Sequence, residues 1–512
     1  MDFETNYDIA QTANFIHSRN FIRVALQFPD ELLKDAVKVV STLRNKLCSL
    51  RECNSEGSED HRDALLFVMA DTTYGSCCVD EVGASHVNAD CVVHYGHTCL
   101  SPTSTLPAFF VFGKASICVD NCAESLSNYA FANGKPILVL FGLEYANAIQ
   151  HIKEASIVKS SRLSGSTSKL EPRFADVRCS IMNPPKDHST SNGQLRLDDS
   201  LIANEDCDVT TGTRYSIGGL IWNLPEGHKM DDYLLFWIGS DNSAFANVVL
   251  TFNGCEIVRY DATENCLVTD LSPQRRILKR RYYLVEKAKD ANIIGILVGT
   301  LGVAGYLHMI HQMKDLITGA GKKAYTLVMG RPNPAKLANF PECDVFIYVS
   351  CAQTALLDSK EYLSPVITPF EAMLAFNRGS QWTGAYVMEF RDLITAPSFE
   401  FKNDQSEGAR FSFFQGGYVD NLDFQENGKE DGEVALALAH ATEKALQVND
   451  KYPRSLTAKS GAEFFATRSY HGLEMHGNSS SPQPFSIGRT GKASGYEDEK
   501  TNQENMSSVG QF

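Results

Sequence analysis

Three separate stretches of the chain repeat one local order: a short apolar strand, a tight turn and then an amphipathic helix. The strands are predicted over residues 20–27, 136–141 and 292–298. The helix after the first strand is expected over residues 31–47, where Leu and Val recur at helical spacing behind Asp30 as a possible cap. Strands that alternate with helices favour parallel sheets, so the expected fold class is α/β.

A second similarity links the first and third of these stretches. Residues 86–99 read HVNADCVVHYGHTC and residues 340–351 read FPECDVFIYVSC, so each has an aspartate, an apolar run with a tyrosine and a cysteine just past the strand. The match needs a one-residue gap, and it predicts a triplicated α/β unit. Ligands of parallel sheets gather beyond the carboxyl ends of strands. The cysteines found at such ends are Cys99, Cys351 and the pair Cys77 and Cys78.

Amino-acid composition along the chain predicts where its domains begin and end. A stretch rich in Ser, Asp and Asn predicts a long disordered insertion over about residues 155–213, and the end of the chain has little to bury. We therefore expect a first α/β domain, a second one that carries the insertion, a third one and a mostly disordered tail. Their expected ranges are residues 15–115, 116–290, 291–450 and 451–512.

Charge and hydropathy exclude several classes of protein. The net charge of −15 argues against nucleic-acid binding through bulk electrostatics. One basic run, RRILKRR at residues 275–281, is either the solvated face of a helix or a docking patch for an acidic partner. No apolar run reaches the roughly 18 to 20 residues of a membrane helix, and the first residues lack a signal-peptide profile. We expect a cytoplasmic protein with no membrane contact.

Fourteen cysteines remain to be explained. In a cytoplasmic chain they should be reduced, and the absence of any C-x2-C pair excludes zinc ribbons and fingers. An iron–sulfur cubane needs thiolates that converge on one small volume, with three sulfurs within about 7 Å of one another. Spacing alone leaves Cys78, Cys99 and Cys351 each as either such a ligand or a small buried residue at a strand end. His94 and His97 are expected to be ordinary core or surface histidines.

Two further motifs give weak signals. Cys118 and Cys122 form a C-x3-C pair, but the C-x3-C-x2-C triplet of ordinary radical S-adenosylmethionine enzymes is missing. Residues 299–305 read GTLGVAG between a strand and a helix. This turn could present backbone N–H groups to an anion, or it could simply be a tight connection.

Five motifs that occur in order make the chain resemble the diphthamide synthesis, or 2-(3-amino-3-carboxypropyl)histidine synthase, family, and in particular its second eukaryotic subunit. They are DTTYGSCCVDE at 71–81, VHYGHTCLSP at 93–102, GTLG at 299–302, VSCA at 349–352 and TPFEA at 368–372. The resemblance covers about residues 15–395, a helix before residue 450 and a short patch at 470–474.

The resemblance implies three similar domains around a central site that holds a [4Fe-4S] cluster. It also implies a reaction, the transfer of a 3-amino-3-carboxypropyl group from S-adenosylmethionine to a histidine carbon of elongation factor 2. In that chemistry the cluster binds the methionine part at an open iron and injects one electron. The implied partners are a catalytic paralogous subunit in a heterodimer, elongation factor 2 as protein substrate and a small electron-donor protein.

One departure from the family pattern bears on the role of this chain. Residues 218–225 read GGLIWNLP, with Trp222 where the middle domain of the catalytic subunit carries its cysteine. The implied ligands are then Cys78, Cys99 and Cys351. Cys77 is the alternate, because adjacent residues point in opposite directions in an extended chain. The role so implied is non-catalytic, an iron–sulfur subunit that supports reduction of the partner's cluster; the alternative is a chain that itself cleaves S-adenosylmethionine.

Overall fold

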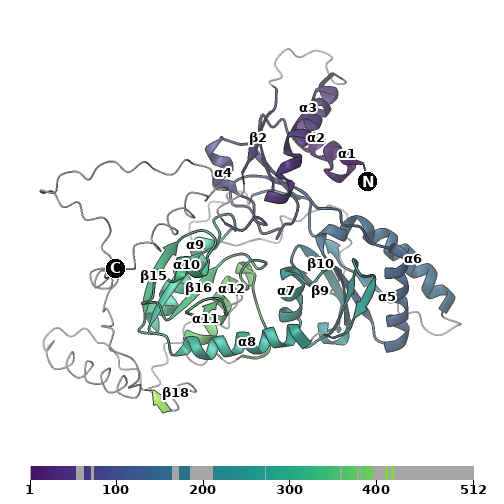
Figure 1. Cartoon of the computed structure of the whole chain (residues 1–512). Helices are drawn as coiled ribbons and strands as arrows, with labels where there is room; N and C mark the ends of the chain where they lie inside the picture. Colours follow the sequence, from purple (N-terminus) through teal and green to yellow (C-terminus); the bar gives the residue numbers. More distant parts are fainter. Residues whose placement is uncertain are drawn as a thin grey trace, which may run out of the picture. The chain divides into compact units, whose positions relative to one another are not determined.

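The computed structural model falls into two units, residues 1–445 and 446–512, and everything described below belongs to the first. The tail expected at 451–512 and the helix expected before residue 450 lie outside the described residues. Figure 1 shows three sheets of mostly parallel strands with helices packed beside them, which confirms a mixed α/β fold. The described ranges are 2–52, 63–70, 74–163, 172–184, 212–270, 272–357, 360–377, 380, 382–395, 410–412 and 417–419.

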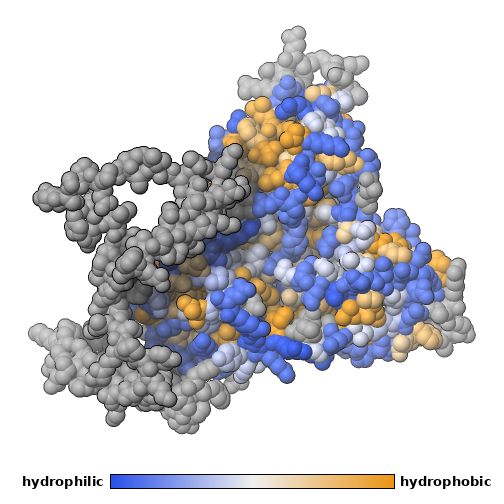
Figure 2. Space-filling view, viewed as in Figure 1, coloured by the Kyte–Doolittle hydropathy of each residue, from blue (hydrophilic) through white to orange (hydrophobic). Residues whose placement is uncertain are grey.

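The first sheet has the strand order β2-β1-β3-β4-β8, in which β8 alone is antiparallel to its neighbour. Its apolar strands β1 and β3 are buried between helices, whereas β2 is an exposed edge. Figure 2 shows an apolar area where β2 lies, and Leu65 and Val68 are about half exposed there. The strands are β1 (Arg23–Gln27), β2 (Leu65–Met69), β3 (Cys91–Tyr95), β4 (Ala108–Val111) and β8 (Ile181–Met182).

The helix predicted over residues 31–47 begins differently from the expectation. Residues Asp30–Asp35 form a 3-10 turn, η1, and the α-helix α3 (Ala36–Glu52) follows it. Pro29 occupies the cap position of η1 and has no side-chain acceptor, so no cap hydrogen bond fixes the first N–H groups in α-helical geometry. The neighbouring helices are α1 (Phe3–Asn6), α2 (Ile9–Ser18) and α4 (Glu81–His86).

The third sheet repeats the order of the first, as β15-β14-β16-β17 with every pair parallel. Its strands are β14 (Ile293–Val298), β15 (Lys323–Val328), β16 (Val345–Val349) and β17 (Val366–Ile367). The helices in this region are α8 (Ser272–Lys289), α9 (Tyr306–Gly319), α10 (Pro334–Leu337), α11 (Pro369–Phe376) and α12 (Phe390–Thr395).

The two aspartates noticed in the sequence occupy equivalent places in these two sheets. Asp90 Oδ2 accepts hydrogen bonds from the backbone N–H groups of Ile22 and Arg23, on either side of the start of β1, both at 2.8 Å. Asp344 Oδ2 does the same at the start of β14, at 2.8 and 2.9 Å. When Asp90 is matched with Asp344, His94 of β3 corresponds to Tyr348 of β16, so the tyrosines of the two runs do not occupy equivalent places.

The middle sheet has the order β13-β12-β11-β5-β6, and a smaller antiparallel sheet, β7-β10-β9, lies in the same region. Its strands are β5 (Ile137–Phe141), β6 (Arg173–Phe174), β11 (Leu234–Ile238), β12 (Glu256–Asp261) and β13 (Cys266–Val268), and those of the smaller sheet are β7 (Asp176–Val177), β9 (Gly212–Ile217) and β10 (Leu220–Pro225). The helical elements are α5 (Val119–Asn133), η2 (Leu143–Tyr145), α6 (Ala146–Leu163), η4 (Met230–Asp232) and α7 (Ser243–Thr251). A two-stranded pair, β18 (Arg410–Ser412) and β19 (Gly417–Val419), follows later in the chain.

The predicted insertion at 155–213 is narrower than composition suggested. Helix α6 continues to Leu163, and the short strands β6, β7 and β8 join sheets between residues 173 and 182. Their polar composition misled the prediction, because short edge strands need few buried side chains. Residues 164–171 and 185–211 lie outside the described ranges.

The basic run at 275–281 lies in α8, and its residues divide between the exposed face of this helix and the protein interior. Arg275, Arg276 and Lys279 are exposed, and Figure 2 shows mainly hydrophilic side chains where α8 runs. Arg281 is buried and forms an ion pair with Glu371 of α11. No helix in the described ranges has both the length and the apolar composition to cross a membrane.

Candidate metal centre

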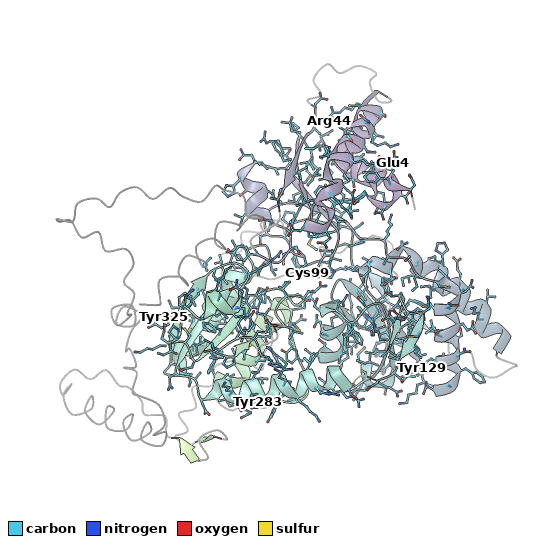
Figure 3. All side chains as sticks on the ribbon, viewed as in Figure 1. Glu4, Arg44, Cys99, Tyr129, Tyr283 and Tyr325 are labelled. Atoms are coloured by element: carbon cyan, nitrogen blue, oxygen red, sulfur yellow. The ribbon has the colours of Figure 1, made fainter. Side chains whose placement is uncertain are left out.

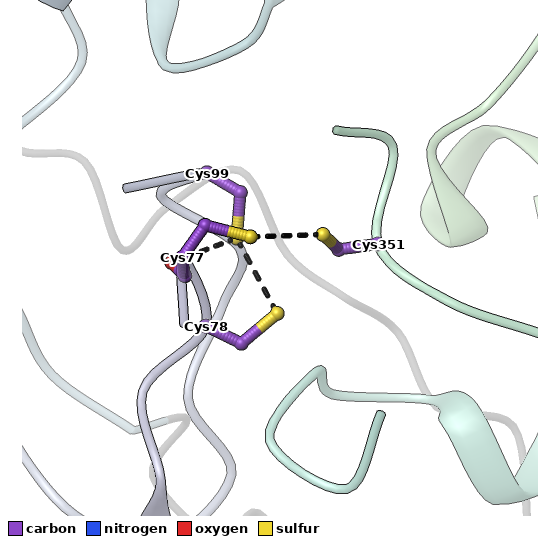
Figure 4. A group of neighbouring side chains, drawn as sticks. All are labelled: Cys77, Cys78, Cys99 and Cys351. Atoms are coloured by element: carbon purple, nitrogen blue, oxygen red, sulfur yellow. Dashed lines mark hydrogen bonds between the residues drawn. The ribbon is translucent and has the colours of Figure 1, made fainter. Parts of the chain in front are cut away.

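Four cysteine side chains meet where the first and third sheets approach each other, close to Cys99 in Figure 3. The sulfurs of Cys77, Cys78, Cys99 and Cys351 all lie within 4.8 Å of one another, and each residue is at most 5% exposed. Figure 4 shows Cys351 facing the other three, with its Sγ 3.4 Å from that of Cys77. The sulfurs of Cys99 and Cys78 are 3.7 Å apart. Thiols gathered so tightly away from water can act together as metal ligands.

The expectation that only one of Cys77 and Cys78 faces this group is wrong. Both sulfurs belong to it, because residues 75–78 form a turn in which the N–H of Cys78 donates to the carbonyl of Gly75 at 3.2 Å. The rule that neighbouring side chains point to opposite sides holds for an extended strand and not for a turn.

A buried glutamine at the end of β1 fixes the position of Cys78. The side-chain amide of Gln27 donates to the carbonyl of Cys78 at 2.8 Å and accepts from the N–H of Asp80 at 2.9 Å. Asp80 in turn caps α4 by accepting from the N–H of Gly83 at 2.8 Å. Sequence reasoning missed Gln27. Its only signal in the sequence was a polar residue that directly follows the apolar run Val24–Leu26.

The loop that follows Cys99 is held by the buried carboxylate of Glu81. Glu81 accepts hydrogen bonds from the backbone N–H groups of Ser104, Thr105 and Leu106, at 2.6 to 2.8 Å, and from the hydroxyl of Thr105. The N–H of Cys99 itself donates to the carbonyl of Cys77 at 3.1 Å. The two cysteine-bearing loops of the first sheet are thereby tied to each other.

The glycine turn before α9 packs against these loops, which favours the tight connection over the anion cradle. A Cβ atom on Gly302 would lie 2.0 Å from the carbonyl oxygen of Val79, so only glycine fits there. The next residues join the two regions further, since the N–H of Ala304 donates to the carbonyl of Pro102 at 3.0 Å.

Hydroxyl groups contact two of the four sulfurs. Thr354 Oγ1 lies 3.2 Å from the sulfur of Cys351, and Thr300 Oγ1 lies 3.8 Å from that of Cys78. Hydrogen bonding from Cys77 and the other neighbouring thiols lowers the pKa of Cys351. The same sharing of protons, chiefly with Cys351, raises the pKa of Cys77 and of Cys78.

The other residues singled out in the sequence lie elsewhere. His94 is a core histidine whose Nε2–H donates to the carbonyl of Ser76 at 3.0 Å, and burial lowers its pKa to about 4. Cys118 is exposed, and neither it nor Cys122 belongs to the thiol group. Trp222 is a buried residue of β10 that stacks on Tyr215 at 6.0 Å.

A small cavity of about 30 Å³ opens beside Cys99 and was not predicted. Charged side chains line it, among them Arg178, Glu389 and Arg391, together with the backbone of Gly218 and Gly219. Burial, with a smaller contribution from Asp392, raises the pKa of Glu389 to about 7. The cavity therefore combines cationic groups with a carboxyl group that titrates near neutral pH.

Fold and site together define an α/β protein that buries four thiols between two of its sheets. A family model described as "Putative diphthamide synthesis protein" matches residues 28–387, and the chain belongs to this family. It is 39% identical to 2-(3-amino-3-carboxypropyl)histidine synthase subunit 2 of Danio rerio over 77% of this chain and 72% of the relative. It is 33% identical to the subunit 2 of Gallus gallus over 97% of this chain and 94% of the relative.

A solved structure shares the fold. It is the crystal structure of Dph2 from Pyrococcus horikoshii with a 4Fe-4S cluster, which matches with a TM-score of 0.50 and 18% identity. The match covers 74% of this chain and 94% of that one.

Proposed function

We propose that this chain is the iron–sulfur subunit of a heterodimeric 2-(3-amino-3-carboxypropyl)histidine synthase. The complex would carry out the first step of diphthamide biosynthesis, aminocarboxypropyl transfer from S-adenosylmethionine to a histidine of elongation factor 2. The observation that carries the proposal is the convergence of four buried thiols within 4.8 Å of one another. Membership of the family and the subunit 2 relatives support it.

The donor set fits an iron–sulfur cluster. We assign Cys78, Cys99 and Cys351 as its ligands, with Cys77 as the alternate. A [4Fe-4S] cluster bound there supplies one-electron transfer. The chain's own task is to position the thiols, through Gln27 and the other clamps, and to keep water away from them.

We propose that the chain is not itself catalytic and helps to reduce the cluster of a catalytic paralogous subunit. In this proposal the partner holds the reacting S-adenosylmethionine, a small electron-donor protein supplies electrons, and the assembly works in the cytoplasm. The absence of a cysteine at Trp222 supports this division of labour. The alternative is that this chain itself cleaves S-adenosylmethionine.

We further propose that three related α/β domains build the molecule, over residues 15–115, 116–290 and 291–450, with a mostly disordered tail at 451–512. The shared strand order and the paired aspartates of the first and third sheets support the relation between those two. The middle sheet supports it too, because read from its other edge it has the order β6-β5-β11-β12-β13, in which the first four strands are parallel and follow the same chain order as β2-β1-β3-β4 of the first sheet.

Anaerobic reconstitution of the full chain with iron and sulfide tests the proposal. We expect a brown chromophore, with iron and acid-labile sulfide in equal amounts. Cys351→Ala should lose most of the iron, because it removes the thiol that the third sheet contributes. Cys343→Ala, which removes another buried thiol of that region outside the group, should retain it. A colourless chain that binds one zinc ion instead would overturn the cluster assignment.

The alternative is tested on the same preparation. After dithionite is added, the isolated chain is incubated with S-adenosylmethionine labelled in its aminocarboxypropyl group. Labelled aminocarboxypropyl products formed without any partner would show that this chain is catalytic. Unchanged S-adenosylmethionine, together with products once the paralogous subunit is added, is the result we expect.

A further inference from the structure

The two threonines that touch the thiol group have no role in the function proposed above. Thr300 is 1% exposed, and Thr354 is partly buried against Cys351. Their hydroxyl groups are close enough to the sulfurs for weak hydrogen bonds, at 3.8 and 3.2 Å. The direction of each hydrogen bond follows from the partners of each oxygen.

Thr354 can only donate to Cys351 when that sulfur is a thiolate, because a thiolate has no proton to give. Thr354 Oγ1 also contacts the hydroxyl of Ser350. Ser350 Oγ donates its own proton to the carbonyl oxygen of Gly299 at 3.4 Å, so its contact with Thr354 does not set the direction of the Thr354 hydroxyl.

Thr300 is oriented in the same sense. The backbone N–H of Gly302 donates to Thr300 Oγ1 at 3.3 Å, so the oxygen acts as acceptor there and its own proton is free for Cys78. Cys99 is in the opposite situation, because its sulfur lies 3.3 Å from the carbonyl oxygen of Cys77, which is an acceptor. Hydroxyl donors therefore reach Cys78 and Cys351 and not Cys99, among the contacts of the described residues.

We propose that Thr354 and Thr300 are positioning residues that raise the reduction potential of the cluster. The inference rests on the proposed function, since it requires a cluster on these thiols. Reduction adds one negative charge, which is shared with the ligand sulfurs. A hydrogen bond to a more negative sulfur is stronger, so the donors stabilise the reduced form more than the oxidised form.

The test is a redox titration of the reconstituted full chain, followed by absorbance and by the paramagnetic resonance signal of the reduced cluster. Thr354→Val removes the hydroxyl and keeps a similar shape. We expect it to shift the reduction equilibrium about tenfold toward the oxidised form, which is about 59 mV lower in potential for a one-electron couple. Thr354→Ser keeps a hydroxyl and should stay near the wild-type potential. Thr300→Val should shift it in the same direction by less, because its contact is longer.

Thr103→Val is the matched control. Thr103 lies in the loop after Cys99, and its buried hydroxyl has no hydrogen-bond partner among the described residues. Its removal should leave the potential unchanged. Equal potentials for wild type and Thr354→Val, at equal iron content, would overturn the inference, and so would a shift in Thr354→Ser as large as that in Thr354→Val.

Failure of the proposed function looks different, because the wild-type chain would then take up no iron and sulfide at all. If Thr354→Val fails to hold the cluster while the wild-type chain holds it, the reduction potential of Thr300→Val tests the inference instead. A potential equal to that of Thr103→Val would then overturn the inference.

Discussion

The first and third sheets have the same strand order and the same aspartate at the start of their central strands, yet they contribute unequally to the thiol group. The loops of the first sheet bring Cys77, Cys78 and Cys99, and the third sheet brings Cys351. The difference lies entirely beyond the carboxyl ends of the strands. A shared scaffold thus fixes where the loops meet, and the loops decide what chemistry is placed there.

The two regions also stabilise their loops by different means. Glu81 of the first region accepts hydrogen bonds from neutral backbone groups and one hydroxyl. Glu371 of the third region pairs with the buried guanidinium of Arg281 and also accepts from the hydroxyl of Tyr386 at 3.0 Å. These two buried glutamates therefore differ in what their loss leaves behind, a set of N–H groups in one case and a full charge in the other.

The largest effect on stability is expected for Glu371→Gln. The substitution leaves Arg281 buried with no counterion, and such losses cost about 3 to 5 kcal/mol. The free energy of unfolding of the metal-free chain, measured in urea, checks this. Replacing Glu371 and Arg281 together by Met should recover much of the loss, because no charge is then left buried.

Glu286→Gln is the control for that experiment. Glu286 pairs with Lys289 near the surface of α8, and such pairs contribute at most about 1 kcal/mol. A loss for Glu371→Gln no larger than this would mean that the ion pair contributes little to holding the third region together.

Much of the fold follows from the sequence, for a physical reason. The three predicted strands correspond to β1, β5 and β14, because each is a continuous apolar run that must be buried on both faces. Aspartates that recur ahead of the apolar runs also pointed to the relation between the first and third sheets. Which residue of the first sheet corresponds to which residue of the third could not be determined from the sequence, because it depends on the register between β1 and β3.

The site was less predictable than the fold. Cysteines at strand ends could be found, but whether Cys77 faces the group depends on a turn that no local pattern specifies. The clamps Gln27 and Glu81 join residues that are 51 and up to 25 positions apart in the chain. Hydrogen bonds of such range depend on the packed tertiary structure, and single-sequence patterns carry no information about them.

The second prediction uses one place where β3 and β16 differ in a titratable residue, His94 against Tyr348. Burial lowers the pKa of His94 to about 4, whereas an unfolded histidine titrates near 6.5. Between these values the unfolded chain binds the proton and the folded chain does not, so stability falls as the pH drops from about 6.5 to 4. The loss over this window is about 3 kcal/mol.

Urea unfolding of the metal-free chain at several pH values measures that slope. In His94→Gln the slope between pH 6.5 and 4 should become shallower, whatever the change in absolute stability. His86→Gln removes an exposed histidine of the same region and should leave the slope as it is. An unchanged slope in His94→Gln would show that other groups cause the acid sensitivity.

A third, smaller effect is expected for Glu81→Gln. One side-chain oxygen becomes an NH2 group, which cannot accept from the N–H of Ser104, so one charge-assisted hydrogen bond is replaced by two donors facing each other. This costs about 1.5 to 3 kcal/mol. Because the same loop carries Cys99, alkylation of that thiol in the metal-free chain should also become faster. Faster alkylation of Cys343, in the third region, would instead indicate general unfolding.

The smallest effect tests the comparison itself. Asp90→Ala and Asp344→Ala each remove one exposed carboxylate oxygen that accepts two backbone N–H groups, and we expect about 1 to 2 kcal/mol for each in urea unfolding. Since the two sites lie in separate sheets, the double variant should show the sum. If the losses in unfolding free energy of the two single variants differ by more than about 1 kcal/mol, the two sets of hydrogen bonds have the same geometry but contribute unequally to stability. Equal costs would show that the first and third sheets are equivalent in energy as well as in strand order. Two diverged copies of one unit should keep such an equivalence at these aspartates, which take no part in the thiol group.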